Sequence, residues 1–156
     1  MLGHHHIRPL RTDDGPLLDQ VMDGMSVQSR YQRYHVPKPT LTKRDREYLT
    51  AVDGRDHLAL VALSPYGTPL GVARAVRLRE DREAAEVGVE VIDARQGQGL
   101  GSELTALLAR CAGAVGIRRF VAQVLAESAL VAGLERRGWR LVARDGTVVT
   151  YALDVS

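Results

Sequence analysis

The glycine-rich segment 95–102, which reads RQGQGLGS, most constrains what this chain can fold into. It follows a valine-rich run at 86–92 that is typical of a β-strand, and it precedes residues 102–114, whose leucines recur at helical spacing. Such a turn places N–H groups that lack intrahelical partners at the positive end of a helix dipole, where phosphate binds. Glycine also lets the backbone approach a phosphate closely. The segment therefore predicts a site for a cofactor that carries a pyrophosphate.

The spacing of the glycines excludes two common phosphate-binding motifs. A dinucleotide fingerprint reads G-x-G-x-x-G with an acidic residue about 20 residues later, but these glycines read G-x-G-x-G and no acid lies near Phe120. A P-loop requires a lysine directly after its last glycine, and none follows here. A glycine-rich turn without a ligand stays open as an alternative.

The remaining pattern, Gln96-x-x-Gly99-x-Gly101, resembles the acyl-CoA pyrophosphate loop of the GNAT N-acyltransferase superfamily. The resemblance implies acetyl-CoA as co-substrate and an oxyanion donor in the strand before the loop. Ser128 stands where the superfamily often has an asparagine, and its alternative role is to cap the last helix. The cofactor-binding residues implied are Val89, Val91, Gln96, Gly97, Gln98, Gly99, Leu100, Gly101, Ser102 and Ser128.

Apolar periodicity and turn residues predict a mixed α/β chain in the order β-α-α-β-β-β-α-β-α-β-β. This is also the element order of the GNAT fold, and we expect residues 1–156 to form one such domain. The segment 26–39 is less regular than its neighbours. Strands are expected at 5–11, 57–63, 70–78, 85–92, 120–125, 139–142 and 148–155, and helices at 12–25, 42–50, 102–114 and 129–137.

Composition narrows the class of protein. A chain of 156 residues with 45% hydrophobic residues can bury a core, and a net charge of +2 gives no argument for nucleic acid. No apolar run reaches the ~18 residues of a membrane helix, and residues 1–6 lack a signal-peptide pattern. The single cysteine, Cys111, fits a cytoplasmic protein and is expected as a packed thiol on an apolar helix face. We expect no metal site, with His4, His5 and His6 as a native lead-in or a tag remnant.

Two further stretches resemble one subfamily of these acyltransferases. Ser26-x-x-Ser29-Arg30-Tyr31-x-Arg33-Tyr34 and the later Asp53 are similar to the acetyltransferase domain of bacterial protein lysine acetyltransferases. In that family a carboxylate ten residues before the loop glutamine is the general base, which implies Glu86. The chain departs from the family at Leu134, where many members carry a tyrosine that protonates the leaving thiolate.

Glu86 and Glu90 are the candidate catalytic residues. Period-two geometry places them on one face with Gly88 between them, and glycine should leave open space for a substrate. Alternatively, both carboxylates line a solvent-facing edge and pair with arginines. His35 is a second candidate base, with packing as its alternative.

The implied activity is acetyl-CoA-dependent N-acetylation of a primary amine, first of all a protein lysine. Lysine has a pKa of ~10.4, so attack by its neutral amine requires a base. Two alternatives stay open: acetylation of a small-molecule amine, and an acyl-CoA-binding sensor without turnover. The oligomeric state also stays open, a homodimer included.

Overall fold

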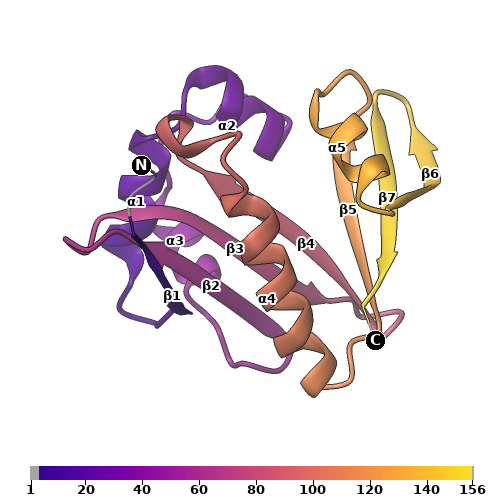
Figure 1. Cartoon of the computed structure of the whole chain (residues 1–156), viewed down its shortest axis with the longest axis horizontal. Helices are drawn as coiled ribbons and strands as arrows, with labels where there is room; N and C mark the ends of the chain where they lie inside the picture. The colour runs from indigo at the N-terminus through magenta and orange to yellow at the C-terminus, as the bar shows by residue number, and fades with distance from the viewer. Residues whose placement is uncertain (1–3, 156) are drawn as a thin grey trace.

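The computed structural model describes residues 4–155 and contains a mixed α/β arrangement around one seven-stranded sheet (Figure 1). The strands lie in the order β1-β2-β3-β4-β5-β7-β6. β4 and β5 are parallel, and all other neighbours are antiparallel. The strands are β1 (His6–Pro9), β2 (His57–Leu63), β3 (Pro69–Arg77), β4 (Ala84–Val91), β5 (Arg119–Leu125), β6 (Arg140–Asp145) and β7 (Val148–Asp154).

Helices cover both faces of this sheet, and two hydrophobic clusters result. α4 and α5 pack on one face, where Phe120 is fully buried, while α1 and α3 pack on the other face around Val61 and Val72. Figure 1 shows α4 lying across β2, β3 and β4, with α2 at one end of β4. The helices are α1 (Gly15–Asp23), α2 (Val27–Tyr34), α3 (Lys43–Leu49), α4 (Leu100–Ala114) and α5 (Leu130–Arg136), with a 3₁₀ turn at Asp93–Arg95.

α2 is an element that the sequence did not predict. Ser26 caps it by accepting a hydrogen bond from the Ser29 N–H at 3.1 Å, and His35 ends it in the left-handed conformation at φ 64°. None of its residues is fully buried, so it lacks the apolar repeat that reveals a helix. The helix expected after Thr42 is present, and Thr42 forms a capping box with Asp45.

β4 and β5 are joined over a very short length. Three pairs connect them, Ala84↔Arg119, Ala85↔Phe120 and Glu86↔Val121, and the strands diverge beyond the last pair. β3 and β4, by contrast, stay paired without a bulge from Arg77↔Ala85 to Gly71↔Val91. The sheet therefore opens on one side of β4 directly after Glu86.

Cys111 is exposed, so the expectation of a packed thiol was wrong. The buried residues of α4 recur every four positions, at Leu100, Leu104, Leu108 and Ala112. Each step of four residues turns the buried direction by about 40° around the helix. By the last turn the sheet faces Ala112, and Cys111 points about 100° away from it.

Within residues 4–155, no helix combines the length and the apolar character that crossing a membrane requires.

Candidate active site

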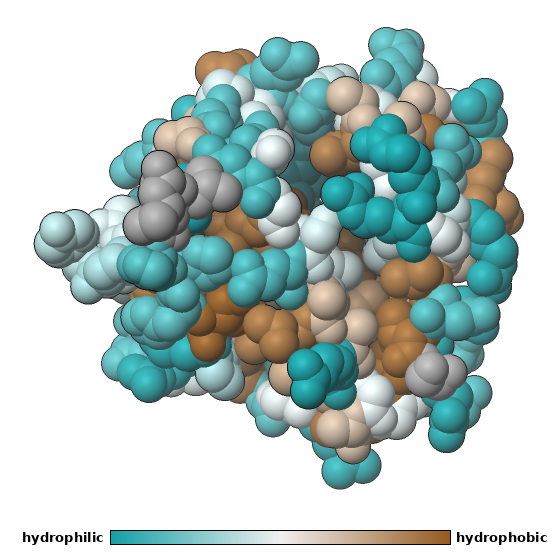
Figure 2. Space-filling view, in the orientation of Figure 1, coloured by the Kyte–Doolittle hydropathy of each residue, from teal (hydrophilic) through white to brown (hydrophobic). Residues whose placement is uncertain are grey.

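A cleft with a volume of about 1370 Å³ lies where β4 and β5 separate. Figure 2 shows the surface hollowed between the part that carries β1–β4 and the part that carries β5–β7. Residues from α2, β4, the loop before α4, β5 and α5 line this cleft. The predicted Glu86, Glu90 and Gly99 all contribute to its walls.

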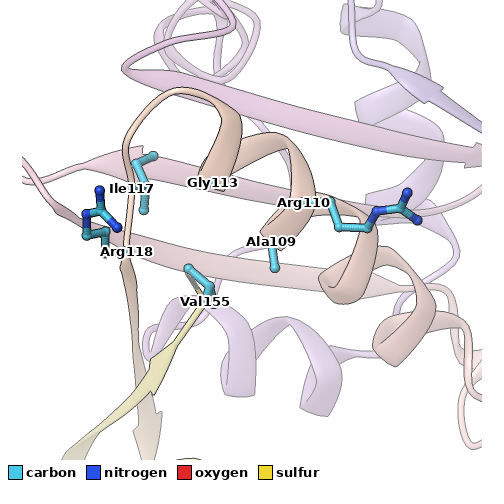
Figure 3. Close-up of a pocket in the computed structure, with 6 residues that line it drawn as sticks. All are labelled: Ala109, Arg110, Gly113, Ile117, Arg118 and Val155. Carbon is cyan, nitrogen blue, oxygen red and sulfur yellow. The ribbon is translucent and has the colours of Figure 1, made fainter.

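A second hollow, of about 370 Å³, lies at the end of α4 (Figure 3). Its lining contains no carboxylate, hydroxyl, thiol or imidazole. Its two arginines, Arg110 and Arg118, lie at opposite sides of Figure 3, and their guanidinium groups do not point toward each other. The candidate acid–base residues Glu86 and Glu90 therefore line the cleft between β4 and β5 and not this hollow.

The loop before α4 has the backbone that its glycines predict. Gly97 and Gly99 have φ values of 75° and 86°, where side chains are disfavoured. Gly99 is the N-cap of α4, and no side chain caps the helix there. A Cβ at Gly97 or Gly99 would meet no atom within 4 Å, so the space above the loop is open. The first turn of α4 therefore offers its N–H groups to an anion in the cleft.

The two segments that carry the family resemblance meet beside this loop. The Gln96 amide donates to the Val91 carbonyl at 2.9 Å and to the Ser29 hydroxyl at 3.3 Å. The Asp93 carboxylate accepts from the Ser26 N–H at 3.1 Å. The side chain of Gln96 thus holds the loop against β4 and α2.

The Gln98 and Ser128 side chains contact protein rather than line the cleft. Gln98 Oε1 accepts from Arg95 Nε at 2.9 Å. Ser128 Oγ accepts from the Leu130 N–H at 3.1 Å within a local turn. The N-cap of α5 is Ala129, and no side chain caps the helix there, so the expected capping role of Ser128 was wrong. Leu134 does line the cleft.

The backbone of β4 points N–H groups into the opening. The Ile92 N–H donates to the carbonyl of Leu70 in β3. On the same side, the Ala84 carbonyl accepts from the N–H of Leu78, the residue after β3. Backbone groups alternate in direction along a strand, so even-numbered residues of β4 bond toward β3. The N–H groups of Val89 and Val91 then face the β5 side, beyond the end of the β4–β5 ladder. This geometry suits the predicted oxyanion donor.

Glu86 and Glu90 share a face of β4 with Gly88, but their surroundings differ. Glu86 is exposed, lines the cleft and has no hydrogen-bond or ion-pair partner among residues 4–155. Glu90 is only 6% exposed. Its Oε1 accepts from the Tyr34 hydroxyl at 3.2 Å and lies 3.4 Å from Arg33 Nε. Burial, and then the Glu90 charge, raises the pKa of Tyr34, so this phenol stays a donor.

The expected open space above Gly88 is filled, which corrects the prediction. A Cβ on Gly88 would lie 2.3 Å from Arg33 Nη2 and 2.7 Å from Arg33 Cζ. The guanidinium of Arg33, from α2, therefore packs directly on this glycine. Glycine is needed here for the close approach of a side chain.

Arg74 is a residue of the site that the sequence reasoning missed. It lies opposite Gly88 on β3 and is only 4% exposed. Its Nη1 donates to the Leu49 carbonyl at 2.8 Å and lies 2.9 Å from His57 Nε2. Burial, and then Arg74, lowers the pKa of His57, so His57 is neutral and accepts this hydrogen bond. An arginine in the apolar run 70–76 was the available signal.

The histidines that the sequence singled out lie in different surroundings. His35 lines the cleft, and its buried Nε2 has no hydrogen-bond partner among residues 4–155. His5 Nε2 lies 2.8 Å from Glu103 Oε1. No group of three or more His, Cys, Asp or Glu side chains within the described part of the chain has metal-site geometry.

Comparison with known proteins shows which family the sequence matches. The profile of the Acetyltransferase (GNAT) family matches residues 22–139. The chain is 34% identical to Acetyltransferase Pat of Mycolicibacterium smegmatis over 96% of its own length, and it spans 45% of that protein.

Two solved structures show the same relationship. The GNAT domain of S. lividans PAT superposes with a TM-score of 0.90 at 30% identity, covering 97% of this chain and 91% of that one. A cAMP-binding acyltransferase from Mycobacterium smegmatis gives a TM-score of 0.66 at 31% identity, covering 97% of this chain and 44% of that one. With the family profile matching most of its length, this chain belongs to the GNAT family of acetyltransferases.

Proposed function

We propose that the protein transfers the acetyl group of acetyl-CoA to a primary amine by direct attack, with Glu86 as general base. One observation carries this assignment. Glu86 is a carboxylate without a partner among residues 4–155, at the last β4–β5 pair and close to the backbone N–H groups of Val89 and Val91 that face the opening. A proton acceptor and an oxyanion donor therefore lie within a few residues on one strand.

In the proposed reaction, the carboxylate and the backbone N–H groups have separate roles. The amine nitrogen forms a bond to the thioester carbonyl carbon, and Glu86 accepts the amine proton directly or through one water. The carbonyl oxygen becomes an oxyanion, which the Val89 or Val91 N–H stabilises. The C–S bond then breaks and releases CoA as a thiolate. A thiol pKa of ~8.5 makes this departure feasible without the acid that Leu134 cannot supply.

The same arrangement indicates how acetyl-CoA would lie. Its pyrophosphate would accept hydrogen bonds from the first turn of α4, over Gly99 and Gly101. Its thioester end would then run along the opened side of β4 toward Glu86. Glu90 is a weaker candidate base, because Tyr34 and Arg33 already occupy its carboxylate.

A protein lysine is the first acceptor to test, because the chain is similar to Acetyltransferase Pat. A small-molecule amine is the second acceptor to test. Thiol release from acetyl-CoA should be measured with lysine peptides, protein substrates and small amines. If the protein binds acetyl-CoA but releases no CoA thiol with any of these acceptors, the result would instead indicate a sensor.

Acetyl-CoA should raise the melting temperature of the protein. A ligand at 100 times its Kd adds ~2.7 kcal/mol to the free energy of unfolding, which for a domain of this size is roughly 5–10 °C. NADH and ATP should have much smaller effects, because the glycine spacing fits neither motif. Differential scanning fluorimetry measures the shift, and no shift at millimolar acetyl-CoA would contradict the cofactor assignment.

A further inference from the structure

Two arginine side chains, one from α2 and one from β3, lie on the face of the sheet that carries Glu90. Arg33 comes from α2 and packs on Gly88, with its Nε 3.4 Å from Glu90 Oε1. Arg74 comes from β3 and extends from the strand position opposite Gly88, on the same face. Both side chains line the cleft that contains Glu86. They lie on the side of the sheet away from α4, opposite the face on which the cofactor loop packs.

The charges in this cluster do not balance. Arg33 and Arg74 carry two positive charges, and the buried carboxylate on this face is that of Glu90, which also accepts from the Tyr34 hydroxyl. The other carboxylate on this face, Glu86, is exposed to solvent. Lys38 and Asp45, which line the same region, pair with each other at 3.0 Å and leave the balance unchanged. His57 contributes no charge, because burial lowers its pKa. An excess buried positive charge is unfavourable unless an anion accompanies it.

The hydrogen-bond donors show the same excess. Arg74 Nη1 is satisfied by the Leu49 carbonyl. Arg74 Nε, Arg74 Nη2 and Arg33 Nε are buried and have no hydrogen-bond partner among residues 4–155. A carboxylate offers two oxygens in a geometry that matches the guanidinium fork. A second carboxylate here would satisfy both the charge and the donors.

We propose that the acceptor of the acetyl group carries a carboxylate near its amine, and that Arg33 and Arg74 hold this carboxylate. The inference rests on the proposed function and names the substrate class of that site. Gly88, under Arg33, is two residues from Glu86, or about 7 Å along the strand. A carboxylate bound at the arginines therefore leaves the amine of a compact molecule within reach of Glu86. The source is either an amino-acid-like small molecule or an acidic side chain beside a target lysine.

Matched acceptor pairs test the proposal in the full chain. Amino acids are compared with their amides, and lysine peptides with a neighbouring Glu are compared with the same peptides carrying Gln. kcat/KM is measured by thiol release and corrected for the fraction of unprotonated amine. We expect at least a tenfold preference for the carboxylate in one set of pairs. The small-molecule set and the peptide set distinguish the two sources.

The preference should fall to about one in Arg33→Gln and Arg74→Gln and persist in Arg110→Gln, a matched variant on the distant end of α4. Replacing Arg33 should disturb folding less than replacing Arg74, because the Arg33 side chain is 24% exposed and Arg74 is deeply buried. Equal use of both members of every pair by the unaltered protein overturns the proposal. A preference that survives in a folded Arg33→Gln variant and a folded Arg74→Gln variant also overturns it.

A binding experiment separates this proposal from the proposed function. N-acetyl amino acids keep the carboxylate and need no catalysis, so calorimetry can measure their binding to the protein with CoA. Binding that weakens at least tenfold in Arg33→Gln supports the carboxylate site even if no amine is acetylated. If peptides without acidic residues are the efficient acceptors and N-acetyl amino acids do not bind, acetyl transfer stands and the carboxylate site is wrong.

Discussion

Replacing Glu86 with glutamine should lower kcat at pH 7 by about 10²- to 10⁴-fold, the usual contribution of a general base. Glutamine keeps the size of the side chain and removes its basicity. Glu86 is exposed and unpaired within the described residues, so the fold should not change. Acetyl-CoA affinity, measured by calorimetry, should also be unaffected.

The pH dependence of this variant provides a second test. Without a base, the reaction depends on amine that is already neutral, and this fraction rises about tenfold per pH unit below a lysine pKa of ~10.4. The activity of Glu86→Gln should therefore recover as the pH rises. Glu90→Gln is the matched control and should lose less activity. An inactive Glu90→Gln beside a fully active Glu86→Gln would assign the base to Glu90.

Replacing Gly101 with aspartate should weaken CoA binding by about 10³-fold. A carboxylate about 4 Å from a phosphate charge at an effective dielectric of ~20 is repelled by about 4 kcal/mol. The fold should tolerate the change, because a Cβ at Gly101 would lie 3.6 Å from Val89 Cγ1 and 3.8 Å from Val91 Cγ2. An acidic residue in the first turn also suits the helix dipole. Isothermal titration with CoA measures the loss.

Gly101→Ala is the control, since it adds the Cβ without the charge and should retain most of the affinity. Gly97 and Gly99 are less informative positions, because their positive φ values would add backbone strain to any substitution. Wild-type affinity in a folded Gly101→Asp variant would mean that the loop does not contact the pyrophosphate.

The strands and the cofactor loop could be predicted because their signals are local. The run expected at 57–63 is β2, His57–Leu63, and the run expected at 85–92 is β4, Ala84–Val91. A continuous apolar stretch marks β2, and closely spaced valines before a glycine-rich turn mark β4. The positive φ values of Gly97 and Gly99 likewise follow from the residue type.

The side of the cleft formed by α2 and β3 could not be predicted, because it depends on contacts between distant segments. α2 has no buried residue and therefore no apolar repeat. The position of Arg33 over Gly88 depends on how that helix docks on β4. The position of Arg74 opposite Gly88 depends on the register of β3 against β4, which the sequence of either strand alone does not specify.

The short joint between β4 and β5 has a mechanical consequence. Three residue pairs connect the strands, and Glu86 belongs to the last of them (Figure 1). A small rotation of β5–β7 and α5 about this joint would displace atoms in proportion to their distance from it. α5 lies far from this joint, so it would move the most and would widen the cleft. The Glu86 carboxylate lies at the joint and would move the least. Such a rotation would separate the motion that admits acetyl-CoA from the ångström-level placement that proton transfer at the proposed base requires.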